Sequence, residues 1–135
     1  MTTPFNLEII TPAGVFYDGE TPNLIVRTTV GDKGILARHE PYIAALPIGI
    51  MRVMTEDKKF RKAAISTGTV QVKDNGDTVI LVQSCEWCDE IDVERAQAAK
   101  ERAEERIRDA ELSDVQHAIA EFKLKRALNR LGAAE

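Results

Sequence analysis

Two hydrophobic periods divide the chain into two parts. Near the start, Phe5, Leu7 and Ile9 alternate with polar neighbours, and this period of two predicts a half-buried β-strand. After Val93, small apolar residues recur every three or four positions, which is the period of an amphipathic helix. Glycine and proline are absent from that part until Gly132. The pattern therefore predicts a β domain followed by a helical one, joined at the charged stretch 86–96.

Residues 1–90 are predicted to form an all-β sandwich or flattened barrel of short strands. Strands are expected over residues 5–9, 15–17, 24–30, 48–54, 62–66, 70–73 and 79–82. Turns are expected at residues 12–14, 18–19, 31–34, 56–59 and 74–77. Asn75-Gly76 favours the positive φ of a tight primed turn. The last strand is apolar on both faces, so we expect both faces to be buried.

Residues 91–135 are predicted to form an antiparallel two-helix hairpin, which makes the fold class α+β. The first helix is expected over residues 93–110 with Asp92 as its N-cap. The second is expected over residues 115–131, capped by Ser113 or Asp114 and stopped at Gly132. The facing stripes are Ala96, Ala99, Ala103, Ile107 and Ala110 on the first helix, and Ala120, Leu124, Ala127 and Leu131 on the second.

The first stripe is mostly alanine, which buries little apolar surface. A leucine in place of each alanine would add three carbons, at about 0.8 kcal/mol each. A hairpin with this seam can be stable when docked and still able to open. A mobile arm and a permanently packed hairpin both remain open interpretations.

Composition narrows the class of protein. The 135 residues are 44% hydrophobic and carry a net charge of −4, and the apolar runs are far shorter than the roughly 20 residues that span a bilayer. Neither half has an excess of basic residues, so nucleic acid is not expected as a partner. No secretory leader is recognised. We expect a cytosolic protein that does not insert into the membrane but can dock on a membrane-bound assembly.

No catalytic constellation is found in the sequence. Cys85 and Cys88 have the C-x-x-C spacing of a redox pair or half a zinc site. A zinc site needs about four ligands, and only His39 and His117 remain to supply them. We expect the two thiols to fill space at a strand end, with a thiol or metal module as the alternative.

Basic residues of the helical part predict an anion site. Lys123, Lys125, Arg126 and Arg130 stand in the second helix against only Glu121. Arg126 and Arg130 are four apart and share a face. A folded hairpin would bring them beside Arg95 and Arg102 of the first helix, and guanidinium groups grip phosphate through paired N–H donors. The alternative is a solvated charged face with ordinary ion pairs. No P-loop or Rossmann glycine motif is present.

Several motifs in order resemble the epsilon subunit of bacterial F-type, proton-translocating ATP synthases. The opening residues 7–17 are similar to that family's first hairpin, and residues 31–39 to its glycine motif. Ile91-Asp92-Val93-Glu94-Arg95-Ala96 resembles the I-D-x-x-R-A motif of the ATP-binding members, and residues 124–131 resemble their second helix. The chain departs from the family at Ala37-Arg38, where Pro-Gly is usual, at Thr67-Gly68-Thr69, where Gly-Gly is usual, and at Cys85, Trp87 and Cys88.

The resemblance implies a non-catalytic central-stalk subunit that couples proton transport to ATP synthesis. It implies a sandwich of residues 1–90 that binds the γ subunit and the membrane ring of c subunits, with contacts at Asp32, Gly34 and His39. Residues 91–135 would be a mobile hairpin that can extend into the catalytic α/β head and inhibit ATP hydrolysis. The location implied is the cytoplasmic side of the cell membrane, as a peripheral component.

ATP would be a regulatory ligand that favours the folded hairpin, and the resemblance leaves open whether Mg²⁺ takes part. The ATP contacts that it implies are Glu86, Ile91, Asp92, Arg95, Ala96, Arg102, Arg126 and Arg130. A stand-alone nucleotide sensor without a motor partner is the alternative function.

Overall fold

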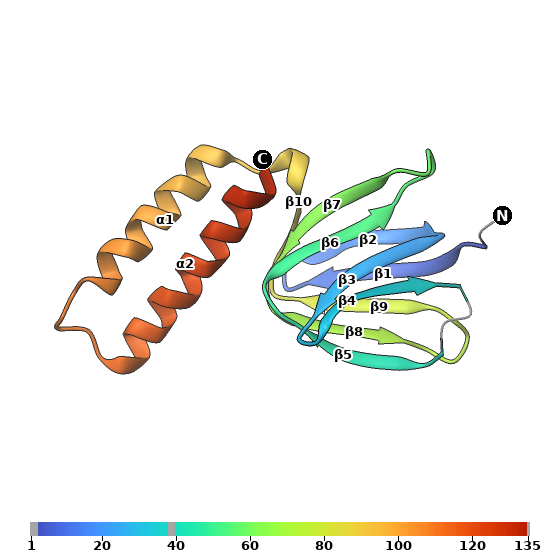
Figure 1. Cartoon of the computed structure of the whole chain (residues 1–135), viewed down its shortest axis with the longest axis horizontal. Coiled ribbons are helices and arrows are strands. Elements are labelled where there is room, and N and C mark those ends of the chain that lie inside the picture. The colour runs from blue at the N-terminus through green and yellow to red at the C-terminus, as the bar shows by residue number, and fades with distance from the viewer. Residues whose placement is uncertain (1–2, 38–39, 135) are drawn as a thin grey trace. The chain divides into compact units, whose positions relative to one another are not determined.

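The computed structural model describes residues 3–37 and 40–134. The chain divides into two compact units, Met1–Trp87 and Cys88–Glu135. Strands make up the first unit and helices the second, which confirms the predicted α+β class (Figure 1).

The first unit is a sandwich of two five-stranded sheets (Figure 1). Its strands are β1 (Phe5–Thr11), β2 (Gly14–Thr21), β3 (Asn23–Thr28), β4 (Gly31–Leu36), β5 (Tyr42–Leu46), β6 (Gly49–Met54), β7 (Phe60–Ile65), β8 (Gly68–Val72), β9 (Thr78–Val82) and β10 (Cys85–Trp87). One sheet has the order β2-β1-β9-β8-β5 and the other β10-β7-β6-β3-β4. The β1–β9 pair is parallel, while the other strand pairs are antiparallel.

The core lies between the inner faces of the two sheets and follows the predicted alternation. Phe5, Leu7 and Ile9 are buried on β1, as are Leu24 and Val26 on β3. Buried side chains from both sheets form one hydrophobic cluster, which includes these five residues. The prediction that β9 is buried on both faces is wrong, because Leu81 is 50% exposed. A run of apolar residues cannot by itself distinguish a strand buried on both faces from one with an exposed apolar face.

The expected turn at residues 31–34 is also wrong, because those residues begin β4. The chain turns instead at residues 29–30, between β3 and β4. There the Thr28 hydroxyl accepts from the Val30 N–H at 3.2 Å and donates to the Gly31 carbonyl at 2.8 Å. Gly31 has a φ of +120°, a conformation that L side chains rarely adopt. The predicted turn at residues 18–19 lies within β2, where Asp18 pairs with Glu8 on β1.

The hairpin at residues 74–77 joins β8 to β9, as predicted, but its turn is not a primed one. Gly76 alone among its residues has a positive φ, of 88°, and its N–H donates to the Lys73 carbonyl at 2.9 Å. A primed type I′ turn needs positive φ at both central residues. Asn75 instead uses its side chain, whose Oδ1 accepts from the Asp77 N–H at 3.0 Å.

The second unit is a hairpin of α1 (Val93–Ile107) and α2 (Asp114–Ala134), preceded by the 3₁₀ turn η1 (Cys88–Glu90). Asp92 is the N-cap of α1, as predicted, and accepts from the Arg95 N–H at 3.1 Å. Ser113 caps α2 in a capping box with Gln116, because each side chain bonds the other residue's backbone N–H, at 3.2 and 3.0 Å. The first helix ends three residues earlier than expected, at Ile107.

Alanine dominates the seam between the two helices, as predicted. Ala96 and Ala103 are buried on α1, and Ala120 and Ala127 on α2. Gly132 does not stop the second helix, which continues to Ala134. Gly132 is not among the glycines with positive φ, so it does not adopt the left-handed conformation of a helix C-cap.

Gly132→Ala is expected to stabilise α2 by about 0.5–1 kcal/mol, because alanine loses less backbone entropy in a helix than glycine does. A Cβ at this position would meet nothing within 4 Å. Thermal unfolding followed by circular dichroism at 222 nm measures the effect. An unfolding temperature below that of the parent would show that the protein requires glycine rather than alanine at position 132.

Candidate functional site: a cationic groove in the helical hairpin

A groove of about 800 Å³ runs along one face of the hairpin between α1 and α2. Alanines from both helices line it, among them Ala99 and Ala103 on α1 and Ala120 and Ala127 on α2. These side chains leave the space that leucines would fill. The alanine seam that weakens the packing of the helices is therefore also what makes the groove.

Five basic side chains line the groove, and two acidic side chains accompany them. The basic residues are Arg102 and Arg106 on α1 and Lys123, Arg126 and Arg130 on α2. The acidic residues are Glu105 and Asp109, on the last turn of α1 and in the loop that follows. Each basic set follows a helical spacing of three or four residues, which places its members on one face. The excess of positive charge suits the groove to an anion with several phosphate groups.

Three of the predicted ATP contacts, Arg102, Arg126 and Arg130, lie together in this groove. Arg95 precedes Arg102 by seven positions, so it shares that face of α1, but it is not among the groove-lining residues. Ala96 is buried in the seam. The role of these residues toward ATP stays a prediction.

The remaining predicted contacts lie before the first helix. One oxygen of Asp92 is engaged by the helix cap. Ile91 is half-buried between η1 and α1. Glu86 belongs to the sandwich unit, on β10, where it pairs with Ala64 of β7. The structure thus gathers arginines suited to phosphate in one unit, while Glu86 lies in the other.

Arg106 and Lys123 were missed as members of the site. Both were visible as spacing signals, because Arg106 follows Arg102 by four residues and Lys123 precedes Arg126 by three. Lys123 was counted only as part of a basic helix. Helical spacing shows which residues share a face of a helix, but it does not show which part of that face borders the groove.

Trp87 is held inside the sandwich unit by an aromatic and cationic cluster. Its ring centroid lies 5.0 Å from that of Phe16 and 6.2 Å from that of Tyr17, and the Arg61 guanidinium lies 4.2 Å from its ring centroid. Burial, together with the nearby charge of Glu56, raises the pKa of the Tyr17 hydroxyl. The unusual tryptophan at this position is thus a packing residue of the sandwich.

Cys85 and Cys88 are not joined by a disulfide. Cys85 packs against the sandwich core, as expected of a space-filling side chain, and Cys88 is 8% exposed. Within residues 3–37 and 40–134, no group of three or more His, Cys, Asp or Glu side chains could hold a metal ion.

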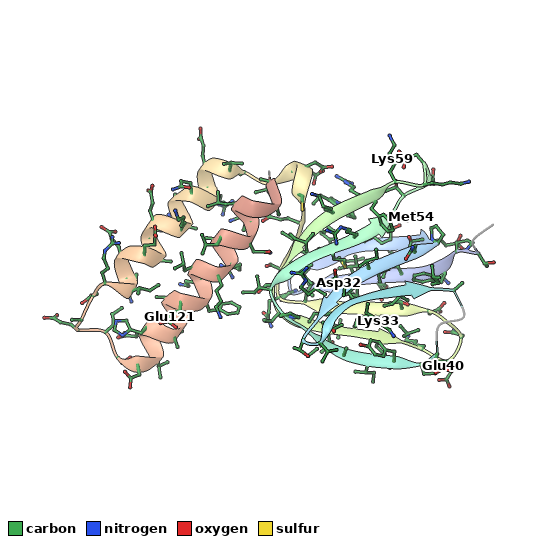
Figure 2. The ribbon with its side chains drawn as sticks, viewed as in Figure 1. Asp32, Lys33, Glu40, Met54, Lys59 and Glu121 are labelled. Atoms are coloured by element: carbon green, nitrogen blue, oxygen red, sulfur yellow. The ribbon has the colours of Figure 1, made fainter. Side chains whose placement is uncertain are left out.

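Two of the three predicted partner contacts, Asp32 and Gly34, lie on β4, an edge strand of the sandwich. Asp32 is labelled there in Figure 2, and its carboxylate pairs with the Arg27 guanidinium on β3 at 3.1 Å. Neighbouring Lys33 lies over the Tyr42 ring, 5.1 Å from its centroid. Gly34 follows on the same strand, and a Cβ added to it would meet nothing within 4 Å. The third predicted contact, His39, lies outside the described residues.

Comparison with family models matches both units. Residues 4–88 match the β-sandwich domain of the ATP synthase delta/epsilon chain, and residues 89–135 match its long α-helix domain. Among the described helices, none has the length and apolar character to cross a membrane.

Curated relatives cover between 79% and 99% of the chain. The chain is 42% identical to the ATP synthase epsilon chain of Ruminococcus albus over 130 residues, 96% of each chain. It is also 42% identical to that of Caldanaerobacter subterraneus subsp. tengcongensis over 134 residues, 99% of this chain and 96% of the relative. The epsilon chain of Alkaliphilus oremlandii is 49% identical over 107 residues, 79% of this chain and 78% of the relative.

Solved structures share the fold at lower identity. A chain in the Euglena gracilis mitochondrial ATP synthase superposes with a TM-score of 0.82 at 24% identity, over 100% of this chain and 84% of that one. A chain in the central stalk and c-ring structure of the Tetrahymena thermophila mitochondrial enzyme gives a TM-score of 0.61 at 12% identity, covering 99% and 98%.

Proposed function

The chain belongs to the ATP synthase delta/epsilon family, and from that membership we propose that it is a non-catalytic central-stalk subunit of an F-type, proton-translocating ATP synthase. Its sandwich would bind the γ subunit and the c-subunit ring, with Asp32 and Gly34 on β4 among the contacts. The complex would place it at the cytoplasmic side of the cell membrane as a peripheral component. The relatives named epsilon chain, at about 40% identity over most of their length, support this assignment.

We further propose that the hairpin binds ATP and that ATP favours its folded state. The observation that carries this step is the groove in which Arg102, Arg126 and Arg130 meet. A ligand shifts a two-state element only by its differential affinity for the two states. Folding gathers the arginines from two helices, whereas separation of the helices scatters them. Bound ATP would therefore stabilise the folded hairpin by RT ln(1 + [L]/Kd).

The regulatory consequence follows from this linkage. A hairpin held folded by ATP cannot extend toward the catalytic α/β head, so ATP hydrolysis would proceed without inhibition. When ATP falls, the alanine seam alone would hold the two helices together. The arm would then extend and inhibit hydrolysis, which protects the remaining ATP.

Calorimetric titration of ATP into the isolated chain, with and without Mg²⁺, tests the binding step. We expect saturable binding of one ATP per chain. Absence of binding up to millimolar ATP would reject the ATP-gated arm and leave the coupling role standing. Co-purification with γ tests that coupling role separately, and its failure would favour a stand-alone nucleotide sensor.

A further inference from the structure

The turn between β8 and β9 contains a chemically reactive pair of residues that has no part in the function proposed above. Asn75-Gly76 is the one Asn-Gly pair in the sequence, and Asn75 is exposed. Asparagine before glycine is prone to deamidation, because glycine has no Cβ to hinder attack by its own backbone nitrogen. The other asparagines, Asn6, Asn23 and Asn129, precede leucine or arginine, so the chemistry points to this turn.

The reaction needs only water and proceeds through a ring. The Gly76 backbone nitrogen gives up its proton to hydroxide and attacks the Asn75 side-chain carbonyl carbon, Cγ. The new N–Cγ bond forms as the Cγ–Nδ2 bond breaks, and the amide nitrogen takes up a proton and leaves as ammonia. Water then opens the resulting succinimide. Cleavage of the ring bond to Cγ leaves aspartate at position 75, whereas cleavage of the bond to the backbone carbonyl carbon leaves isoaspartate, whose main chain runs through the side chain.

Hydrogen bonds of the folded turn hold both reacting groups. The Gly76 N–H donates to the Lys73 carbonyl at 2.9 Å. Asp77 engages both ends of the Asn75 amide, because Oδ1 accepts from the Asp77 N–H at 3.0 Å and Nδ2 donates to Asp77 Oδ2 at 3.2 Å. Ring closure requires the Gly76 nitrogen to lose its proton and the Asn75 side chain to rotate toward it. Each of these bonds opposes one of the two steps, so reaction is expected mainly from an opened turn.

Asp77 is also anchored to the first strand of the sheet. Its Oδ1 accepts from Asn6 Nδ2 on β1 at 3.2 Å, while its Oδ2 holds Asn75. The Lys73 N–H donates to the Asp77 carbonyl at 2.8 Å and closes the hairpin. Opening of the turn therefore breaks bonds within the turn and one bond to β1, which places its free energy above that of a frayed loop tip.

We propose that Asn75 is a site of spontaneous deamidation and that the carboxylate of Asp77 limits its rate by keeping the turn closed. Conversion to aspartate removes the Nδ2 donor that holds Asp77. Conversion to isoaspartate also adds a carbon to the main chain close to the paired residues Val72 and Thr78. Either product would loosen the end of the β8–β9 hairpin, and the change accumulates with the age of the protein because the ammonia is lost.

The test follows the mass and elution of the tryptic peptide that begins at Asp74, after incubation of the whole chain at mildly alkaline pH, folded in buffer or unfolded in urea. Deamidation replaces an amide nitrogen by oxygen, and the gain in mass is expected in this peptide first. The folded parent should react at least about tenfold more slowly than the unfolded one. Asp77→Ala should react about three- to tenfold faster than the parent when folded, because the hydrogen bonds of the carboxylate are lost, and at the parent's rate when unfolded.

Asp74→Ala is the matched control, since it removes the same charge from the same turn, and no hydrogen bond joins the Asp74 side chain to Asn75 among the described residues. Its rate should stay within about twofold of the parent's. Asn6→Ala removes only the bond to β1 and should accelerate the reaction less than Asp77→Ala does, and Trp87 fluorescence confirms that each variant is folded. Equal rates for the folded and unfolded parent, or for folded Asp77→Ala and Asp74→Ala, would overturn the inference. An Asn75 that stays unmodified in the unfolded chain would overturn it as well.

Discussion

Arg126→Ala is expected to weaken ATP binding by about ten- to a hundredfold, the largest loss among the groove residues. Arg126 follows Lys123 by three residues and precedes Arg130 by four on the rim of the groove that α2 provides. Its guanidinium can grip two phosphate oxygens at once, and a hydrogen bond to a charged group contributes about 1.5–3 kcal/mol. Calorimetric titration of ATP into the variant and the parent measures the loss.

Two further variants separate the grip of the guanidinium from the general positive charge of the helix. Lys125→Ala removes a neighbouring charge outside the groove and should bind ATP as the parent does. Arg126→Lys keeps the charge but replaces the planar fork by a point charge, so it should recover only part of the affinity. If Arg126→Ala bound ATP as tightly as the parent, the account of a folded state stabilised by gathered arginines would be wrong.

In the proposed function, the alanine seam would link ATP binding to opening of the hairpin. Ala96, Ala103, Ala120 and Ala127 are buried between the helices, and they contribute less packing than larger side chains would. Three of them, Ala103, Ala120 and Ala127, also line the groove that a ligand can occupy. A bound anion would therefore supply interhelical attraction at the place where apolar packing is weak. Without it, the repulsion among the cations of the groove opposes the folded hairpin.

For the sandwich, the sequence predicted which faces of the strands are buried better than it predicted where the strands begin and end. Alternation identified the inward faces of β1 and β3, because a one-residue slip would move the buried Phe5, Leu7 and Ile9 of β1 and Leu24 and Val26 of β3 to the outer face. Glycine was less informative, since Gly34 lies within β4 and Gly132 within α2. A glycine permits a turn or a helix end, but neighbouring strands and helices decide whether the chain takes it.

The site was predictable only in part, for a geometric reason. Helical spacing placed Arg126 and Arg130 on one face, and the alanine stripes predicted two closely packed helices. Which side chains line the groove depends on the rotation of each helix about its axis, and one sequence does not determine that rotation. Position along the helix matters as well: Arg95 and Arg106 both share a face with Arg102, but the α1 residues that line the groove begin at Ala99, after Arg95.

Gly68→Ala is expected to destabilise the sandwich by about 3 kcal/mol or more, because the added methyl group would overlap a neighbouring backbone. A Cβ on Gly68 would lie 2.0 Å from the Leu81 carbonyl oxygen and 2.7 Å from the Val82 Cα. Both atoms belong to β9, which pairs with β8 at this position and also with β1. Neither strand can shift without disturbing the hydrogen bonds of the sheet.

Urea unfolding followed by the fluorescence of Trp87 measures this loss. Trp87 is the only tryptophan of the chain, and its ring packs with Phe16 and Tyr17 in the sandwich unit, so the signal reports that unit. Gly34→Ala is the matched control, since a Cβ there meets nothing within 4 Å, and its free energy of unfolding should stay within about 0.5 kcal/mol of the parent's. A Gly68→Ala midpoint equal to that of Gly34→Ala would show that β8 and β9 can separate at little cost. The close approach of the two strands at Gly68 would then not be needed for the sandwich, and alanine at this position would be tolerated.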